Sequence, residues 1–336
     1  MAAANSSGEG PSPLLDRNLA FELARVTEAA ALAAARWMGR GDKNSADQAA
    51  VTAMRMTLNN VDMDGIVVIG EGEKDEAPML YIGEHVGNGL PPEVDVAVDP
   101  IDGTTLTSKG LPNALAVVAI ARRGSMYYPP GIVYMDKLAV GAVGRGVVSL
   151  ELSPGENVRE LARARNRQPE DLCVCILDRP RHEEVIAKVR EAGARIMLIS
   201  DGDVAGAIMA AMEDYTGVDM LMGVGGSPEA VIAAAAMTCL GGEIQCRLYP
   251  RNEGEAEQAR KIGLDLKKVM HTHDLVQDND VCVSLTGVTP GELVDGVRFF
   301  ARGARTNTLV MRSASGTTRR IESEHHFEKV SRYTGL

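Results

Sequence analysis

The residues with the clearest chemical potential are Asp99 and Asp102, two carboxylates three positions apart at the start of the stretch Asp-Pro-Ile-Asp-Gly-Thr-Thr. They follow residues 94–98, whose alternating apolar and β-branched side chains predict a strand. Gly103 permits a tight or left-handed turn. Mg²⁺ prefers oxygen ligands and often shares its coordination between a few carboxylates, water and a substrate phosphate. The stretch therefore predicts a site for a hard cation and a phosphate, with backbone N–H groups of the turn facing the phosphate.

A second apolar segment also ends in acids. Residues 65–70 predict a buried strand, and Glu71, Glu73 and Asp75 follow within five positions. A charged run after a strand is usually a solvated loop. Two acidic strand ends side by side would nevertheless repel each other unless a cation lay between them. Because ligands gather outside strand ends in open sheets, the coincidence favours a metal site.

Two further acids come from predicted helix starts. Ser45 and Gln48 fit a capping box that opens a helix over residues 45–58, which places Asp47 in the first turn. There the carboxylate would suit the helix dipole, and that role alone would account for it equally well. Glu229 follows a glycine-rich turn. The acids predicted to converge are Asp47, Glu71, Glu73, Asp99, Asp102 and Glu229.

This set of carboxylates suits metal-assisted hydrolysis of a phosphate ester. Two cations roughly 3.5–4 Å apart can clamp a phosphate and activate a water, and phosphoryl transfer needs mainly positioning and charge neutralisation. The sequence shows no legible Ser/His/Asp or Cys/His arrangement, so a metal-activated water is the simplest nucleophile. Thr104 would orient that water or cap a helix, and the two roles are compatible.

The elements that position these residues predict an α/β protein with a mixed-sheet first half and a parallel-rich second half. The first half carries helices over residues 17–38 and 45–58 and closely spaced strands over 114–121, 131–141 and 147–152, which favours antiparallel pairing. In the second half, helices over 156–166, 183–192, 204–212 and 228–240 alternate with strands over 172–177, 195–199 and 218–222, as in parallel β-α-β units. A short helix over 290–294 and a hairpin through 308–321 follow.

The polar turns after the second-half strands should meet at one sheet edge. These turns, residues 178–182, 200–203 and 223–229, combine arginines, aspartates and glycines, which suits a phosphorylated polyol. We expect a disordered tail over residues 1–15, a metal-binding phosphatase domain over 16–153 and an α/β substrate-binding domain over 154–336. The C-terminal strands could return to the phosphatase domain.

Amino-acid composition limits the binding partners and the cellular compartment that we expect. The formal net charge of −11 argues against a nucleic-acid-binding surface, and no apolar run reaches the ~18 residues of a membrane span. The first 13 residues lack the Lys and Arg of a signal or transit peptide. Five scattered cysteines indicate a reduced, cytoplasmic setting. The histidines at 271, 273, 325 and 326 lack further ligands at metal spacing and are expected at the surface.

The stretch Asp99-Pro-Ile-Asp-Gly-Thr104 resembles the signature of the lithium-sensitive, metal-dependent sugar and inositol phosphatases. Three flanking strings, residues 37–44, 68–80 and 225–229, sharpen the resemblance to the class II fructose-1,6-bisphosphatases of bacteria, particularly the actinobacterial type. The resemblance runs from about Asp16 to the C-terminal hairpin.

This resemblance implies a layered α/β sandwich, a homo-oligomer (dimer or tetramer), Mg²⁺ or Mn²⁺, and hydrolysis of the 1-phosphate of fructose 1,6-bisphosphate in gluconeogenesis. The implied metal ligands are Asp47, Glu71, Asp99, Asp102 and Glu229. The implied substrate contacts are Asp102, Gly103, Thr104, Tyr134, Arg179, Pro180, Arg181, Asp201, Gly202, Asp203 and Gly226. The catalytic set is Thr104, whose hydroxyl helps to activate the water, with Lys43, Asp75 and Glu73. Some members of the family carry Glu at the position of Asp102.

Three alternatives remain open. A dual fructose/sedoheptulose bisphosphatase would use the same chemistry, and so would an inositol or nucleotide phosphatase. Arg179 and Arg181 suit a second, non-reacting phosphate and so favour a bisphosphate. A metal-loaded sugar-phosphate binding protein without turnover would bind the same ligands and release no phosphate.

Overall fold

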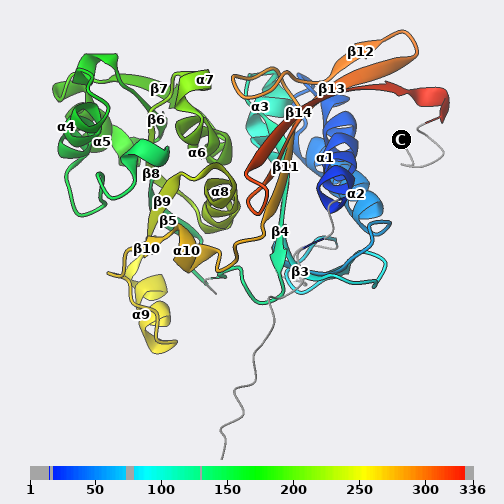
Figure 1. Ribbon diagram of the computed structural model, residues 1–336, viewed down its shortest axis with the longest axis horizontal. Helices are drawn as coiled ribbons and strands as arrows, with labels where there is room; N and C mark the ends of the chain where they lie inside the picture. The colour runs from blue at the N-terminus through cyan, green and yellow to red at the C-terminus, as the bar shows by residue number, and fades with distance from the viewer. Residues whose placement is uncertain (1–14, 16–17, 73–78, 129–130, 330–336) are drawn as a thin grey trace, which may run out of the picture.

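The computed structural model describes residues 15, 18–72, 79–128 and 131–329. Five layers alternate between helices and sheets (Figure 1). Helices α1 (Leu19–Ala35) and α2 (Lys43–Leu58) cover the outer face of the first sheet. Helices α6 (Asp203–Ala211) and α8 (Ser227–Leu240) lie between the two sheets, and α4 (Pro154–Ala164) and α5 (Glu183–Glu191) cover the outer face of the second.

The first sheet has eight strands in the order β12-β13-β11-β4-β3-β1-β2, with β14 on the free side of β13. Only β1 and β3 pair in parallel, and the other pairs are antiparallel. Its strands are β1 (Asp64–Ile69), β2 (His85–Val86), β3 (Glu93–Asp102), β4 (Leu115–Arg122), β11 (Cys282–Gly287), β12 (Arg298–Phe300), β13 (Gly303–Arg312) and β14 (Thr317–His326). The terminal strands thus extend a sheet that the first third of the chain begins.

The second sheet has six strands in the order β10-β9-β5-β8-β6-β7. Strands β8, β6 and β7 run parallel, whereas β5, β9 and β10 join by antiparallel pairs. Its strands are β5 (Tyr134–Val140), β6 (Cys173–Leu177), β7 (Arg195–Ile199), β8 (Met220–Gly226), β9 (Glu243–Leu248) and β10 (Met270–His271). The mixed sheets confirm the predicted α/β class, and the domain division at residues 153–154 stays a prediction.

Smaller elements complete the chain: the helices α3 (Thr104–Lys109), α7 (Glu213–Thr216), α9 (Glu253–Lys261) and α10 (Thr272–Leu275), and short 3₁₀ turns at Ala142–Gly144, Pro169–Asp171 and Pro180–His182. None of the helices in the described part of the chain is both long and apolar enough to cross a membrane.

The core lies on both faces of the first sheet. In β4, Val117 and Ala119 pack into the layer between the sheets, whereas Val118 and Ile120 pack against α1. Successive side chains of a strand point to opposite faces, so a strand buried on both faces is a continuous apolar run. Helix α8 is apolar almost all round because it is buried between two sheets.

Several local predictions were wrong. Helix α2 is capped by Asp42, whose side chain accepts a hydrogen bond from the Ser45 N–H, so Ser45 is not the cap and Asp47 lies beyond the first turn. Asp42 is as good a cap as Ser45 and comes first. Residues 147–152 form turns rather than a strand, residues 290–294 form no helix, and residues 223–226 extend β8 instead of forming a turn.

Candidate active site

Five of the six acids predicted to converge line one cavity of about 280 Å³, which we call the acidic cavity. They come from helix α2, the end of β1, the end of β3 and the start of α8: Asp47, Glu71, Asp99, Asp102 and Glu229. Gly103 and Thr104 line the same cavity. The sixth acid, Glu73, and the predicted catalytic Asp75 lie outside the described residues.

An irregularity in β3 delivers both of its carboxylates to this cavity. Residues three apart on a regular strand point to opposite faces of the sheet. The register between β3 and β4 shifts between Asp99 and Asp102, which is where Pro100 interrupts the strand. A bulge re-aims the side chains that follow it, so both carboxylates reach the same side.

Gly103 makes the turn into helix α3. Its φ of 99° is in the left-handed range, and a Cβ at this position would lie 2.8 Å from Leu106 Cδ1. Gly103 is the N-cap, so the interpretation of Thr104 as the cap was wrong. Thr104 is instead the first helical residue, half-buried at the cavity wall. In the part of the chain that the structure describes, its hydroxyl has no hydrogen-bond partner, so it is available to a ligand in the cavity.

The acids raise one another's pKa values. Loss of hydration raises the pKa of Glu71 to about 7, helped by the charges of Asp47 and Glu229. Burial, followed by neighbouring carboxylates, raises the pKa of Asp99 and Asp102 well above the ordinary range. Burial also raises the pKa of Glu229. Such shifts mark a concentration of buried negative charge, which is typical of functional sites.

The donor set fits a hard divalent cation. Glu229 Oε2 is buried without a hydrogen-bond partner, and an orphaned carboxylate oxygen is costly unless a cation or a donor reaches it. Carboxylate oxygens are the ligands that Mg²⁺ and Mn²⁺ prefer. Among the described residues, no three or more His, Cys, Asp or Glu side chains stand close enough together to hold a metal ion. The fit therefore rests on the chemistry of the donors that line the cavity.

A second cavity of about 260 Å³ adjoins the first, and we call it the arginine cavity. The two share Asp102, Asp201 and Glu229 in their walls. The second-half turns meet here as predicted, with Tyr134, Arg179, Arg181, Asp201, Gly202, Asp203, Gly225 and Gly226 in the lining. Pro180 is not in the lining and instead begins the 3₁₀ turn Pro180–His182 between the two arginines.

Hydrogen bonds around the start of helix α3 connect the residues of the two cavities. Lys43 Nζ donates a hydrogen bond to Thr105 Oγ1 (2.7 Å), which brings the predicted catalytic lysine to the start of α3. The Thr105 N–H donates to Asp201 Oδ2 (3.3 Å), and the Ala205 N–H of α6 donates to Asp102 Oδ2 (3.2 Å). The predicted residues from both halves of the chain therefore form one connected site.

Comparison with known proteins identifies the family. Residues 17–325 match the family model of the bacterial, glpX-encoded fructose-1,6-bisphosphatases. The chain belongs to this family. The class 2 fructose-1,6-bisphosphatase of Haemophilus influenzae is 45% identical over 329 residues, which cover 94% of this chain and 98% of the relative. The fructose-1,6-bisphosphatase 1 class 2 of Escherichia coli K12 is 45% identical over 326 residues, which cover 93% and 96%. These matches confirm the predicted resemblance to class II fructose-1,6-bisphosphatases.

Sequence reasoning missed a buried ion pair in this member of the fructose-1,6-bisphosphatase family. Lys137 is 2% exposed and donates to Asp203 Oδ2 at 2.7 Å. The signal was a lysine within the apolar strand over residues 131–141, where a charge needs a partner. Gly225 and Thr105 were also missed. A Cβ on Gly225 would lie 1.8 Å from Asp203 Oδ2, and a Cβ on Gly226 1.8 Å from Glu229 Oε2, so both glycines give the carboxylates room.

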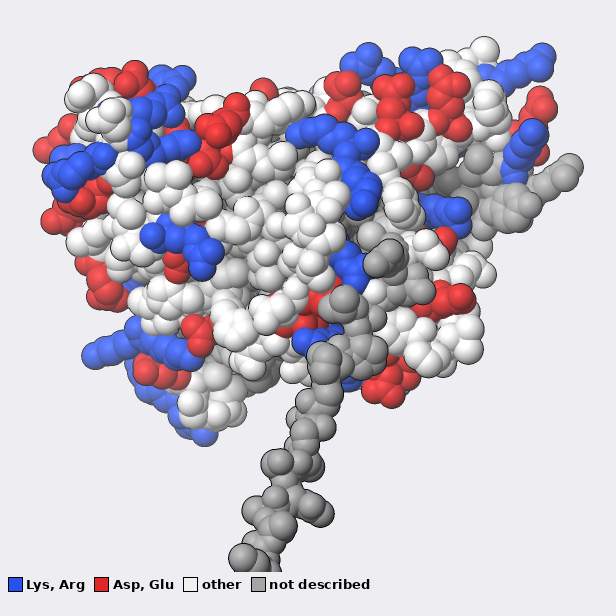
Figure 2. Space-filling view, viewed as in Figure 1, with Lys and Arg blue, Asp and Glu red and all other residues white. Residues whose placement is uncertain are grey.

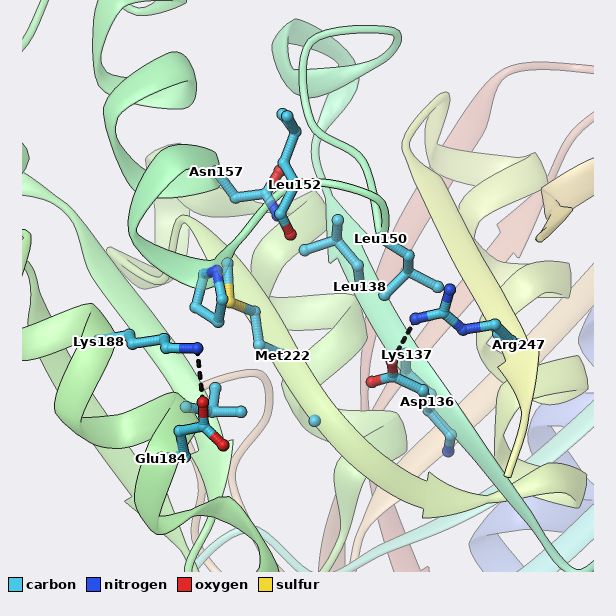
Figure 3. A pocket seen from close by; sticks show the side chains of 13 residues that line it. Asp136, Lys137, Leu138, Leu150, Leu152, Asn157, Glu184, Lys188, Met222 and Arg247 are labelled. Atoms are coloured by element: carbon cyan, nitrogen blue, oxygen red, sulfur yellow. Dashed lines mark hydrogen bonds and ion pairs between the residues drawn. The ribbon is translucent and has the colours of Figure 1, made fainter. Parts of the chain in front are cut away.

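A third cavity of about 430 Å³ contains none of the predicted site residues (Figure 3). It lies between α4, α5 and the second sheet, over an apolar floor that includes Leu138 and Met222. Its charged side chains already have partners: Lys188 pairs with Glu184 (2.6 Å), and Arg247 pairs with Asp136 (3.4 Å). Lys137, which also lines the cavity, pairs with Asp203 outside it. We therefore assign it no ligand.

Proposed function

We propose that the chain hydrolyses the 1-phosphate of fructose 1,6-bisphosphate to fructose 6-phosphate and phosphate, as its family membership indicates. The observation that carries this proposal is the junction of two complementary cavities. The acidic cavity gathers carboxylates with raised pKa values, and the arginine cavity beside it offers cationic groups. One molecule with a reacting and a non-reacting phosphate would span both.

The proposed cation ligands are Asp47, Glu71, Asp99, Asp102 and Glu229, with Mg²⁺ or Mn²⁺ bound. The bound cation would neutralise phosphate charge and lower the pKa of a water molecule. Thr104 then orients the attacking water through its hydroxyl, and Lys43, tethered by Thr105, supplies positive charge at the start of α3. Roles for Glu73 and Asp75 stay predictions.

The rest of the sugar bisphosphate would lie in the arginine cavity. Arg179 and Arg181 would hold the non-reacting phosphate, because guanidinium groups match phosphate oxygens in pairs. Asp201 and Asp203 would accept hydrogen bonds from sugar hydroxyls. Gly103, Gly202 and Gly226 would allow close approach, Tyr134 would form a wall, and Pro180 would shape the turn between the arginines.

We further propose a cytoplasmic homo-oligomer. The setting is supported by five cysteines, all of them free thiols. Gel filtration with light scattering of the full chain would give the oligomeric state directly, and a monomer at cellular concentrations would contradict the second part.

Phosphate release is the decisive test. Protein stripped with a chelator should be inactive, and Mg²⁺ or Mn²⁺ should restore release from fructose 1,6-bisphosphate, with inhibition by Li⁺. Sedoheptulose bisphosphate, inositol phosphate and a nucleotide monophosphate complete the panel. An Asp99→Asn variant should lose at least 100-fold in rate, and wild-type rates in that variant would contradict the ligand role. Binding of the bisphosphate with no phosphate release under any cation would identify a binding protein instead.

A further inference from the structure

Strand β8 separates from β6 where the arginine cavity begins. The two strands pair only from Val174–Met220 to Ile176–Met222. On its other side β8 stays paired with β5 as far as Tyr134–Gly226. The edge of β8 that faces β6 is therefore left without a strand partner from Gly223 onward, and its backbone groups need other partners.

His182 supplies one of these partners. Its side chain is buried, with the residue 1% exposed. Nε2 accepts a hydrogen bond from the Val224 N–H at 2.8 Å, and Nδ1 lies 2.7 Å from the carbonyl oxygen of Leu177, the last residue of β6. Because a backbone N–H can only donate, Nε2 is the acceptor and Nδ1 carries the proton that it donates to Leu177. The imidazole thus bridges the two strands in place of a ladder hydrogen bond.

The residue before His182, Arg181, binds the other backbone polar group of Val224. The Val224 carbonyl accepts hydrogen bonds from Arg181 Nε (3.2 Å) and Nη2 (2.8 Å). The guanidinium carbon of Arg181 also lies 5.2 Å from the centre of the Tyr134 ring. Arg181 is therefore held against β8 and β5 at the wall of the arginine cavity, and Val224 is the fixed point that holds it.

The backbone at Gly223 independently shows how closely the ring is fitted. Gly223 has a φ of +128°, and a Cβ there would lie 2.9 Å from His182 Nε2. A side chain at this position would therefore be strained in its backbone and would force the ring or the strand to shift. Burial lowers the pKa of His182, which keeps the ring neutral and Nε2 free to accept; the charges of Arg181 and Arg179 act in the same direction, and that of Asp136 and the bond to Leu177 oppose it.

We propose that His182 is a positioning residue for the non-reacting phosphate. Its imidazole bridges β6 and β8 where the two strands separate and fixes Val224, which in turn fixes Arg181. This inference rests on the proposed function for the identity of the phosphate. His182 itself does not line the arginine cavity. Its loss should weaken substrate binding while the metal-assisted step, which is carried out by the acidic cavity, keeps its rate.

The test compares His182→Phe, which keeps a planar ring and removes both hydrogen bonds, with His182→Gln and Gly223→Ala. The matched control is His326→Phe, on an exposed histidine of β14. We expect KM for fructose 1,6-bisphosphate to rise about tenfold in the three variants with kcat within twofold of the parent, since each lost hydrogen bond contributes modestly. Amide hydrogen exchange at Val224, measured by NMR, should accelerate in both His182 variants and stay unchanged in the control.

Several outcomes would overturn the proposal: an unchanged KM in the folded variants, a fall in kcat at constant KM, or an unchanged Val224 exchange rate in the His182 variants. If His182→Phe does not fold, the KM values of His182→Gln and Gly223→Ala test the proposal in its place. If the parent protein releases no phosphate, the proposed function fails separately, and calorimetric binding of fructose 6-phosphate replaces KM. A tenfold weaker affinity in the variants would then support the positioning role, and equal affinity would overturn it.

Discussion

At the scale of single residues, the carboxylates of the acidic cavity lower the stability of the folded protein. Five carboxylates line it, burial reduces their hydration, and one oxygen of Glu229 has no hydrogen-bond partner in the described part of the chain. Without a cation this arrangement costs folding free energy at neutral pH, because buried like charges repel and are poorly hydrated. The same cost becomes affinity once a divalent cation binds.

The first prediction follows from the sign of these pKa shifts. Folding raises the pKa of Glu71 from its ordinary 4.5 to about 7, so the folded state holds this proton more tightly than the unfolded state. The cation-free protein should therefore lose stability as pH rises through this interval, by on the order of 3 kcal/mol from this one group between pH 5 and pH 8. Denaturant titrations in chelator at several pH values would measure it.

Two comparisons check the cause of that pH dependence. The Glu71→Gln variant should flatten the profile, because the amide does not titrate. Saturating Mg²⁺ should also flatten it or reverse its sign. A cation-free protein that becomes more stable from pH 5 to pH 8 would contradict the account.

The second prediction concerns the buried pair Lys137–Asp203. Lys137→Met should destabilise the protein by about 3–5 kcal/mol, since it leaves the Asp203 carboxylate buried beside other acids without its cation. Adding Asp203→Asn should recover much of that stability. Thermal unfolding of the two single variants and the double variant gives the coupling energy, and additive effects would show that the pair is not coupled. The double variant should still bind substrate more weakly, because Asp203 lines the arginine cavity.

At the scale of elements, close packing of backbone and carboxylate sets the shape of the site. Strand β8 runs into α8 through Gly225 and Gly226, and the absence of side chains there lets Asp203 and Glu229 approach the strand. The irregularity in β3 has a comparable effect, because it turns two carboxylates to one side. Both features are local departures from regular strands, and both lie at the cavity wall.

The third prediction tests this element-level requirement. Gly226→Ala would place a Cβ 1.8 Å from Glu229 Oε2, so the carboxylate must shift from its observed position. We expect at least a 100-fold loss of phosphate release and weaker activation by Mg²⁺, with circular dichroism unchanged. Gly254→Ala on helix α9, at a glycine that lines neither cavity, is the control and should keep full activity. Parental activity in Gly226→Ala would mean that Glu229 does not need its observed position.

At the scale of the whole molecule, the site is a junction between two sheets. Helices α6 and α8 fill the space between the sheets (Figure 1). Asp203, the first residue of α6, and Glu229, in the first turn of α8, line the two cavities. On the face shown in Figure 2, acidic and basic side chains are interspersed. The concentration of one charge sign is therefore found inside the acidic cavity rather than over that face.

The fourth prediction belongs to this scale. A cation held by residues from helix α2, from the ends of β1 and β3 in the first sheet and from helix α8 should stabilise the fold by mass action. The expected gain is about 2.7 kcal/mol at a concentration of one hundred times its Kd. The melting temperature should therefore rise with added Mg²⁺ or Mn²⁺ and fall in chelator. Asp99→Asn should show a weaker rise. A melting temperature that is indifferent to cations in the parent protein would contradict a site at this junction.

The sequence by itself determined which side chains can do chemistry and which local turns and strand ends hold them. Acids at strand ends, Gly103 in a turn and the arginine-rich turn at residues 178–182 are local patterns, because side-chain type and the permitted backbone angles belong to single residues and their neighbours. Family membership followed from the same strings. The helix cap at Asp42 could also have been found locally, since two good caps stood three residues apart.

Only the tertiary structure decided which distant residues meet. Lys137 and Asp203 are 66 positions apart, and nothing in the apolar pattern of β5 names the partner that neutralises a buried lysine. The placement of His182 between β6 and β8 likewise depends on where strand pairing stops. Such contacts follow from sheet order and from the packing of α6 and α8 between two sheets, which are non-local outcomes of burying the whole core at once.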